Sequence, residues 1–147
     1  MPGLDDLYRE IILDHYRTPR NRGELAPPAA HAVGHNPLCG DEIEVYVDVV
    51  DGIVTDIKVG GQGCSISQSS ASMMSQAVKG KSIAEVRALV HRFRSMMSIE
   101  EVDEALTANV KLGDLEALQG VVKFPVRIKC AVLAWNTLTD ALSRSAG

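Results

Sequence analysis

The most regular pattern in the sequence is an alternation of apolar and polar side chains between residues 42 and 49. Isoleucine or valine occupies every second position there, at Ile43, Val45, Val47 and Val49. A period of two predicts a β-strand with one buried face. Asp51 and Gly52 follow directly, and this pair is typical of a tight hairpin turn. A further strand is expected to return antiparallel, with one face formed by Ile53, Thr55, Ile57 and Val59.

Helical signals flank these two strands, and a further short strand is expected over residues 30–35. Ser82 with Glu85, and Ser98 with Glu101, have the spacing of a capping box, which marks the start of a helix. The predicted helices cover 4–16, 65–79, 82–97, 98–108, 114–118 and 125–144. This order of elements predicts an α+β fold, in which a small antiparallel three-stranded sheet packs against several helices.

Composition limits the classes of protein that fit. Hydrophobic residues make up 46% of the 147 residues and aromatic residues only 4%, so aliphatic side chains and methionine must fill most of the core. The formal net charge of -4 argues against a nucleic-acid-binding surface. No apolar run approaches the roughly 18 residues that a membrane helix needs. The first residues lack the basic and apolar regions of a signal peptide. We therefore expect a cytoplasmic protein that binds neither nucleic acid nor membrane.

The candidate chemistry lies in three cysteines, Cys39, Cys64 and Cys130. A reducing cytoplasm disfavours disulfides, and the chain has no Cys-x-x-Cys spacing. Cys39 stands two residues before Asp41, and in extended backbone both side chains would point the same way. Cys64 follows a glycine-rich stretch and begins a predicted helix, whose N-terminus would stabilise a thiolate. Cys130 lies in the first turns of the last predicted helix, near the cation Arg127.

Three thiolates and one carboxylate would complete a four-coordinate zinc site. The candidate ligands are Cys39, Asp41, Cys64 and Cys130. Spacing alone leaves this metal site and three unrelated buried thiols equally open. The four histidines lie apart from one another, and only His35 is close enough in sequence to the cysteines to have a role beside them. The glycine-rich stretch 60–63 fits neither of the usual nucleotide-binding patterns.

Five blocks of sequence carry a further signal: YREIILDHYRTPRNRG at 8–23, CGD at 39–41, GQGCSISQSSASMM at 62–74, VKGKS at 78–82 and PVRIKC at 125–130. Together they resemble the SufU-type branch of the U-type iron–sulfur cluster assembly proteins, which are relatives of IscU. The blocks extend over nearly the whole chain and include all three cysteines, so the resemblance is specific. It implies a single SufU/IscU-like domain over residues 1–147, with an inserted helical segment at about 92–118.

Three features separate the chain from IscU proper. Lys129 occupies the position directly before the third cysteine, where IscU-type proteins have a histidine. The helical segment at about 92–118 is absent from IscU. The chain also reads KFPVRIKC where IscU has the L-P-P-V-K motif that its chaperone binds. These departures favour the SufU role over that of a scaffold.

The resemblance implies zinc-dependent sulfur transfer for iron–sulfur cluster assembly. The partner would be a pyridoxal-phosphate-dependent cysteine desulfurase of the SufS type, which makes a persulfide from free cysteine. A histidine of the desulfurase would displace Cys39 from zinc on docking, and the freed Cys39 would accept the sulfur. The implied zinc ligands are Cys39, Asp41, Cys64 and Cys130.

Charged residues outside the ligand set have predicted roles in the same process. Arg127 lies in the motif of the third cysteine, and the resemblance suggests that it anchors Asp41 or the partner. The basic loop after the first helix is predicted to help dock the desulfurase through Arg17, Arg20 and Arg22.

Two other functions would use the same ligands. The protein could be a scaffold on which a [2Fe–2S] or [4Fe–4S] cluster is assembled, or a module whose zinc only stabilises the fold. The lack of a histidine before Cys130 weighs against the scaffold. The carboxylate of Asp41 weighs against the purely structural zinc, because closed structural sites prefer thiolate and imidazole ligands.

Overall fold

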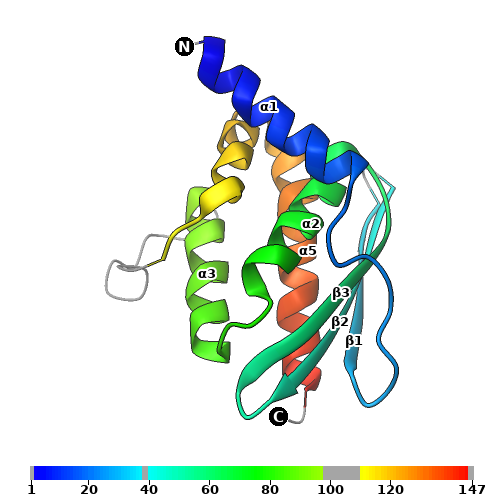
Figure 1. The fold of residues 1–147 in the computed structure, drawn as a ribbon. Helices are drawn as coiled ribbons and strands as arrows, with labels where there is room; N and C mark the ends of the chain where they lie inside the picture. Colours follow the sequence, from blue (N-terminus) through cyan, green and yellow to red (C-terminus); the bar gives the residue numbers. More distant parts are fainter. Residues whose placement is uncertain (1, 38–39, 98–109, 146–147) are drawn as a thin grey trace.

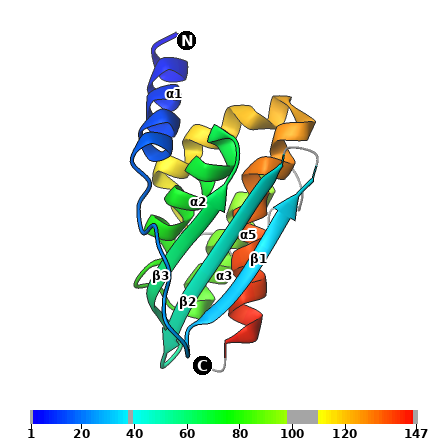
Figure 2. The same cartoon turned by 90° about the vertical axis from the view of Figure 1, so that its right-hand side faces the viewer.

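The computed structural model describes residues 2–37, 40–97 and 110–145, and confirms the predicted α+β fold (Figure 1). Three antiparallel strands form one sheet in the order β1-β2-β3. Helices α2 and α5 cover one face of this sheet, α3 lies beyond them, and α1 crosses one end (Figures 1 and 2). The elements are α1 (Pro2–Arg17), β1 (Ala30–Asn36), β2 (Asp41–Val50), β3 (Ile53–Gln62), α2 (Ser65–Val78), α3 (Ile83–Met96), the 3-10 helix η1 (Gly113–Lys123) and α5 (Pro125–Arg144).

The alternation along β2 has the predicted result at Ile43, Val45 and Val47, which are buried, while the positions between them are half-buried. Val49, at the end of the predicted face, is only half-buried. The hairpin turn is also confirmed: Asp51 and Gly52 both have positive φ, 54° and 75°. The predicted face of β3 is wrong in its first half, since Val54 is buried while Ile53 and Thr55 are exposed. The cause is a shift in register, which pairs Asp48 with Asp56 but Val49 with Val54. Thr55 is thereby left as an extra residue, as in a β-bulge.

The capping box at the start of α3 is present. The Ser82 hydroxyl accepts a hydrogen bond from the Glu85 backbone N–H, and the Glu85 carboxylate accepts one from the Ser82 N–H, both at 3.1 Å. The second predicted helix start, Ser98 with Glu101, lies outside the described residues. The short helix predicted at 114–118 is longer and is a 3-10 helix that continues through Gly120.

The core contains few aromatic side chains, as the composition predicts. Trp135 and Phe93 are fully buried, and their rings stack with centroids 4.5 Å apart. Met73, Met74 and Met97 are also almost completely buried. Methionine adapts to irregular gaps, so it fills space that aromatic rings would otherwise occupy.

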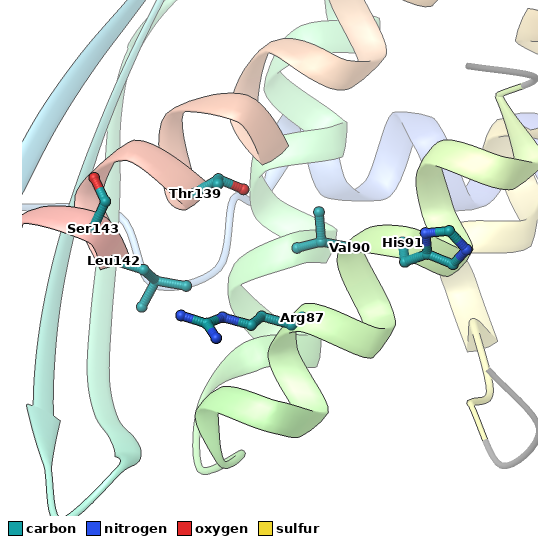
Figure 3. A pocket seen from close by; sticks show the side chains of 6 residues that line it. All are labelled: Arg87, Val90, His91, Thr139, Leu142 and Ser143. Atoms are coloured by element: carbon teal, nitrogen blue, oxygen red, sulfur yellow. The ribbon is translucent and has the colours of Figure 1, made fainter. Parts of the chain in front are cut away.

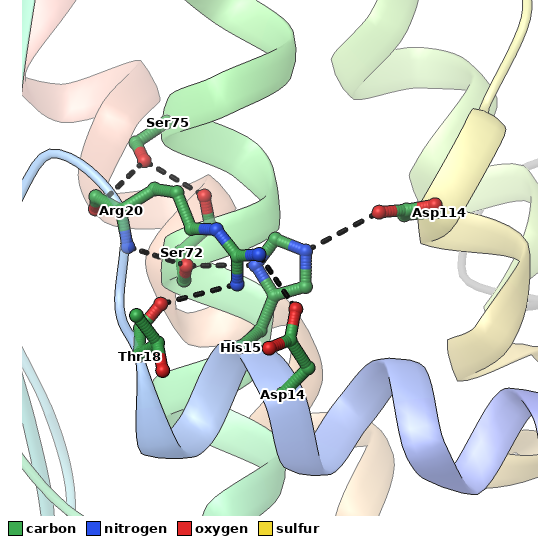
Figure 4. Close-up of polar contacts among 7 residues, drawn as sticks. All are labelled: Asp14, His15, Thr18, Arg20, Ser72, Ser75 and Asp114. Carbon is green, nitrogen blue, oxygen red and sulfur yellow. Dashed lines mark hydrogen bonds and ion pairs between the residues drawn. The ribbon is translucent and has the colours of Figure 1, made fainter.

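Buried serines of α2 attach the N-terminal segment to the core (Figure 4). The Ser72 hydroxyl accepts a hydrogen bond from the Arg20 backbone N–H at 2.9 Å, and the Ser75 hydroxyl donates to the Arg20 carbonyl at 3.2 Å. His15, on α1, is 1% exposed and lies between Ser72, at 2.8 Å from Nδ1, and Asp114, at 3.3 Å from Nε2. These contacts join α1, the following loop, α2 and η1.

The neutral form of His15 satisfies every one of these contacts. With the proton on Nε2, the ring donates to Asp114 and accepts from the Ser72 hydroxyl, which in turn accepts from Arg20. Burial lowers the pKa of His15 below its ordinary 6.5, because the interior disfavours the imidazolium; the Asp114 hydrogen bond partly opposes this. The folded protein therefore holds His15 uncharged at neutral pH.

Stability is consequently expected to fall in mild acid. Between the lowered pKa and 6.5 the unfolded chain binds more protons at His15 than the folded chain, so the free energy of unfolding decreases as pH falls through that window. The slope from this group is at most about 1.4 kcal/mol per pH unit. Denaturant titrations between pH 7.5 and 5 should show a smaller slope for His15→Gln than for the unaltered protein. Identical slopes would contradict this assignment.

Candidate metal centre

The site begins where the β1–β2 ladder ends. Asn36 and Asp41 are the last cross-strand pair, and both side chains lie on the buried face, 6% and 2% exposed. Cross-strand partners have Cβ atoms about 5 Å apart, so an amide and a carboxylate stand side by side. The short loop between them includes Gly40, which has φ +68°, a conformation that glycine adopts without strain.

Cys64 lies opposite this pair as the N-cap residue of α2. Its backbone N–H donates to Oδ1 of Asp41 at 2.9 Å, which fixes the carboxylate at the helix N-terminus. The Ser67 hydroxyl donates to the Cys64 carbonyl at 3.1 Å and lies 3.9 Å from its sulfur. The Cys64 side chain is partly exposed.

Cys130 approaches from the second turn of α5 and is fully buried. Its Sγ lies 3.7 Å from Nδ2 of Asn36 and 3.8 Å from the Val126 carbonyl oxygen. The neighbouring cations Arg127 and Lys129 are exposed, so they lie on the outside of the helix while the sulfur points into the protein.

The structure brings three of the four predicted ligands together. One ligand atom from each of Asp41, Cys64 and Cys130 lies within 4.8 Å of the others. Oδ2 of Asp41 is buried and has no hydrogen-bond partner among the described residues. A buried carboxylate oxygen without a partner is costly, and two adjacent thiols with such an oxygen match the donors that zinc prefers. The residues present therefore fit a metal ion. Cys39, the fourth predicted ligand, lies outside the described residues.

Two predicted participants lie away from this centre. His35 is exposed, because it points to the opposite face of β1 from Asn36. Arg127 is also exposed, and within the described part of the chain it makes no ion pair with Asp41, so the suggested anchor is not observed. Arg127 instead lines a groove of about 700 Å³ together with Arg9 and Lys123, beside the start of α2.

A second hollow lies at the other end of the molecule, between α3 and α5 (Figure 3). It has a volume of about 300 Å³, and the residues that line it include no cysteine or carboxylate: Arg87, Val90, His91, Thr139, Leu142 and Ser143. The chemistry that the sequence predicts therefore belongs to the Asp41–Cys64–Cys130 cluster and not to this hollow. Among the described helices, none is both long and apolar enough to cross a membrane.

Sequence reasoning missed three residues around the cluster. Asn36 directs its amide at Cys130, and Ser67 contacts Cys64. Gly63 leaves room for the Asp41 carboxylate, because a Cβ at this position would collide with Oδ1 of Asp41. Asn36 directly precedes Pro37 in the stretch HNPLCGD, where an asparagine is ordinarily a surface residue. Its burial, which the structure shows, is the feature that marks it as part of the site.

Comparison with known proteins finds a family and curated relatives that match nearly the whole chain. Residues 7–145 match the family of NifU-like N-terminal domains. The chain is 46% identical over 144 residues to the zinc-dependent sulfurtransferase SufU of Bacillus subtilis, covering 98% of this chain and 95% of that protein. It is 43% identical over 143 residues to the iron–sulfur cluster assembly scaffold protein IscU of Streptococcus pyogenes, covering 97% and 87%.

A solved structure shares the architecture. The candidate iron–sulfur cluster assembly scaffold protein for the SUF system from Fervidobacterium islandicum superposes with a TM-score of 0.80 at 32% sequence identity. The match covers 90% of this chain and 94% of that one. At this identity and coverage, the likeness extends over the whole arrangement of sheet and helices.

Proposed function

This chain belongs to the family of NifU-like N-terminal domains, and from that membership we propose that it is a zinc-dependent sulfurtransferase of iron–sulfur cluster assembly. It would accept persulfide sulfur from a pyridoxal-phosphate-dependent cysteine desulfurase of the SufS type. The observation that carries the proposal is the convergence of Asp41, Cys64 and Cys130 around a carboxylate oxygen that lacks a hydrogen bond.

Zinc would be held by these three residues and by Cys39, which completes a set of four. A bound zinc ion keeps its cysteine ligands deprotonated at neutral pH. The protein's own contribution is positional. The Cys64 N–H holds Oδ1 of Asp41, which leaves Oδ2 for the metal. The burial of Cys130 excludes water from one side of the centre.

The transfer step requires no external oxidant or reductant. The Cys39 thiolate attacks the outer sulfur of the donor's persulfide, a new S–S bond forms on Cys39, and the old S–S bond breaks. The donor cysteine leaves as a thiolate, so charge and electrons balance. In the sequence Cys39 lies between β1 and β2, whereas Cys64 is the N-cap residue of α2 and Cys130 lies within α5. We therefore assign the acceptor role to Cys39.

We propose that the surface of this protein that docks the desulfurase includes only part of the predicted basic loop. Arg20 forms an ion pair with Asp14 at 2.6 Å, and Arg22 donates to the Gly61 carbonyl at 2.6 Å. These two arginines hold the loop against α1 and β3, so reversing their charge would disturb the fold as well as any interface. Arg17 and Arg127 are exposed, and Arg127 lines the groove beside the start of α2, so we assign desulfurase contacts to these two.

A scaffold function is the second candidate, because a relative 43% identical to this chain is named a scaffold protein IscU. The same four residues could hold an iron–sulfur cluster. Lys129 stands where the IscU-type histidine would be, which removes a donor next to Cys130. We therefore place the scaffold second.

Metal analysis combined with a turnover assay tests the proposal. Protein purified without added iron should contain about one zinc per chain, and should increase the turnover of a SufS-type desulfurase with cysteine. Removal of zinc by a chelator should lower the melting temperature, because the centre joins β2, α2 and α5. A coloured iron–sulfur chromophore with negligible zinc would favour the scaffold and contradict the sulfurtransferase.

A further inference from the structure

Asn36 is a buried polar side chain beside the centre and is not itself a predicted ligand. It ends β1, is 6% exposed, and pairs in register with Asp41. Its Nδ2 lies 3.7 Å from Sγ of Cys130, a contact between residues 94 positions apart in the sequence. A buried amide is tolerated only where it is hydrogen-bonded, and the contact with Cys130 is one such hydrogen bond.

We propose that Asn36 is a positioning residue, which donates an N–H···S hydrogen bond to Cys130 and keeps that sulfur a fixed ligand of the metal. The inference rests on the proposed function, because it assigns a role beside the same zinc. A hydrogen bond to a thiolate withdraws electron density from the sulfur and restricts its movement. Groups that orient a metal's ligands in this way commonly change metal affinity by 10–100-fold when they are removed.

The two cysteines described in the structure differ in this respect. The Cys130 sulfur is fully buried and receives the amide of Asn36. Cys64 is partly exposed. The neighbouring Ser67 hydroxyl donates its hydrogen bond to the Cys64 carbonyl and not to the Cys64 sulfur. Of these two cysteines, Cys130 is therefore the one that the protein holds more firmly. A fixed ligand of this kind retains the metal while another ligand leaves to accept sulfur.

Cobalt substitution measures the hydrogen bond directly. The protein loaded with Co²⁺ should show sulfur-to-cobalt charge-transfer absorption, and Asn36→Leu should move it to longer wavelength because the sulfur donates more electron density. Zinc release to a chelator should become at least about tenfold faster in Asn36→Leu and Asn36→Asp. His35→Ala, one residue away on the exposed face, should change neither measurement. Unchanged spectra and release rates in the Asn36 variants would overturn the inference.

A measurement without metal separates this inference from the proposed function. In metal-free protein, the side-chain amide resonance of Asn36, assigned by its loss in Asn36→Asp, should shift on Cys130→Ala. It should remain in place in Cys64→Ala. If Cys130→Ala leaves the chemical shift of this resonance unchanged, the hydrogen bond is absent and the inference fails, whatever the metal content of the protein. If the resonance shifts but the unaltered protein binds no zinc, the contact between Asn36 and Cys130 is confirmed and the sulfurtransferase assignment fails. The proposed role of Asn36 in holding a metal ligand then fails as well.

Discussion

Replacing Cys39 with serine is expected to abolish sulfur transfer while leaving zinc partly bound. Serine lacks the thiolate that must attack the persulfide, so no S–S bond can form at this position. Asp41, Cys64 and Cys130 are brought together by contacts among themselves and with Asn36. Three ligands should therefore retain zinc at reduced affinity, and desulfurase turnover should fall to its level without this protein.

Mass spectrometry after a single turnover identifies the acceptor. Mixing with desulfurase and cysteine should add one sulfur atom to Cys39 of the unaltered protein before any other thiol. Cys130→Ser serves as the matched control, because it should lose zinc to a greater extent and lower the melting temperature. A first sulfur on Cys64 or Cys130, with Cys39 unmodified, would show that the assignment of the acceptor is wrong.

Gly63→Ala is expected to damage the metal centre without touching any predicted ligand. The Cβ of alanine would collide with Oδ1 of Asp41 and would lie 2.6 Å from the Ser67 hydroxyl. Either the Asp41 carboxylate or the backbone before Cys64 must then move. Either movement would disturb the hydrogen bond from the Cys64 N–H to Oδ1 of Asp41. Overpacking of this kind costs about 1–3 kcal/mol, and zinc affinity should fall at least about tenfold. Thermal melts and competition with a chelator measure the two effects.

Gly60→Ala provides the control for this change. Gly60 lies three residues earlier, within β3, and a Cβ there would have Oε2 of Glu44 as its nearest atom, at an ordinary 3.5 Å. Its zinc affinity should equal that of the unaltered protein. Equal zinc affinity in Gly63→Ala and Gly60→Ala would mean that the Asp41 carboxylate does not contribute to metal binding.

The elements of the fold were predictable because their signals are local. Alternation places the apolar side chains of β2 on one face whatever the strand packs against. The capping box at Ser82 satisfies backbone groups within the first turn of α3 and needs no tertiary contact. The face of β3 was not predictable in the same way. Its alternation is interrupted by the register shift against β2, and the bulge at Thr55 becomes visible only when both strands are paired.

The candidate ligands were recognisable from residue type and motif, but their geometry was not. Asp41 and Cys64 are 23 residues apart, and their alignment depends on the β2–β3 pairing that returns the chain to the end of β2. Arg127 illustrates the limit of such reasoning. Its position in the motif suggested a contact with Asp41 or with the partner, and only the structure shows that the turn of α5 that buries Cys130 directs Arg127 to solvent, away from Asp41.

The sequence by itself determined which elements form and which side chains can carry the chemistry, because strand period, helix caps and donor atoms are properties of short segments. The tertiary structure alone decided which polar residues meet at the centre. Asn36 and His35 are adjacent, and histidine is the more usual metal ligand. The pairing of Asn36 with Asp41 and the packing of α5 against β1 turn the amide inward and leave the imidazole exposed. Successive residues of a strand face opposite ways, so a single position in register decides which of the two reaches Cys130.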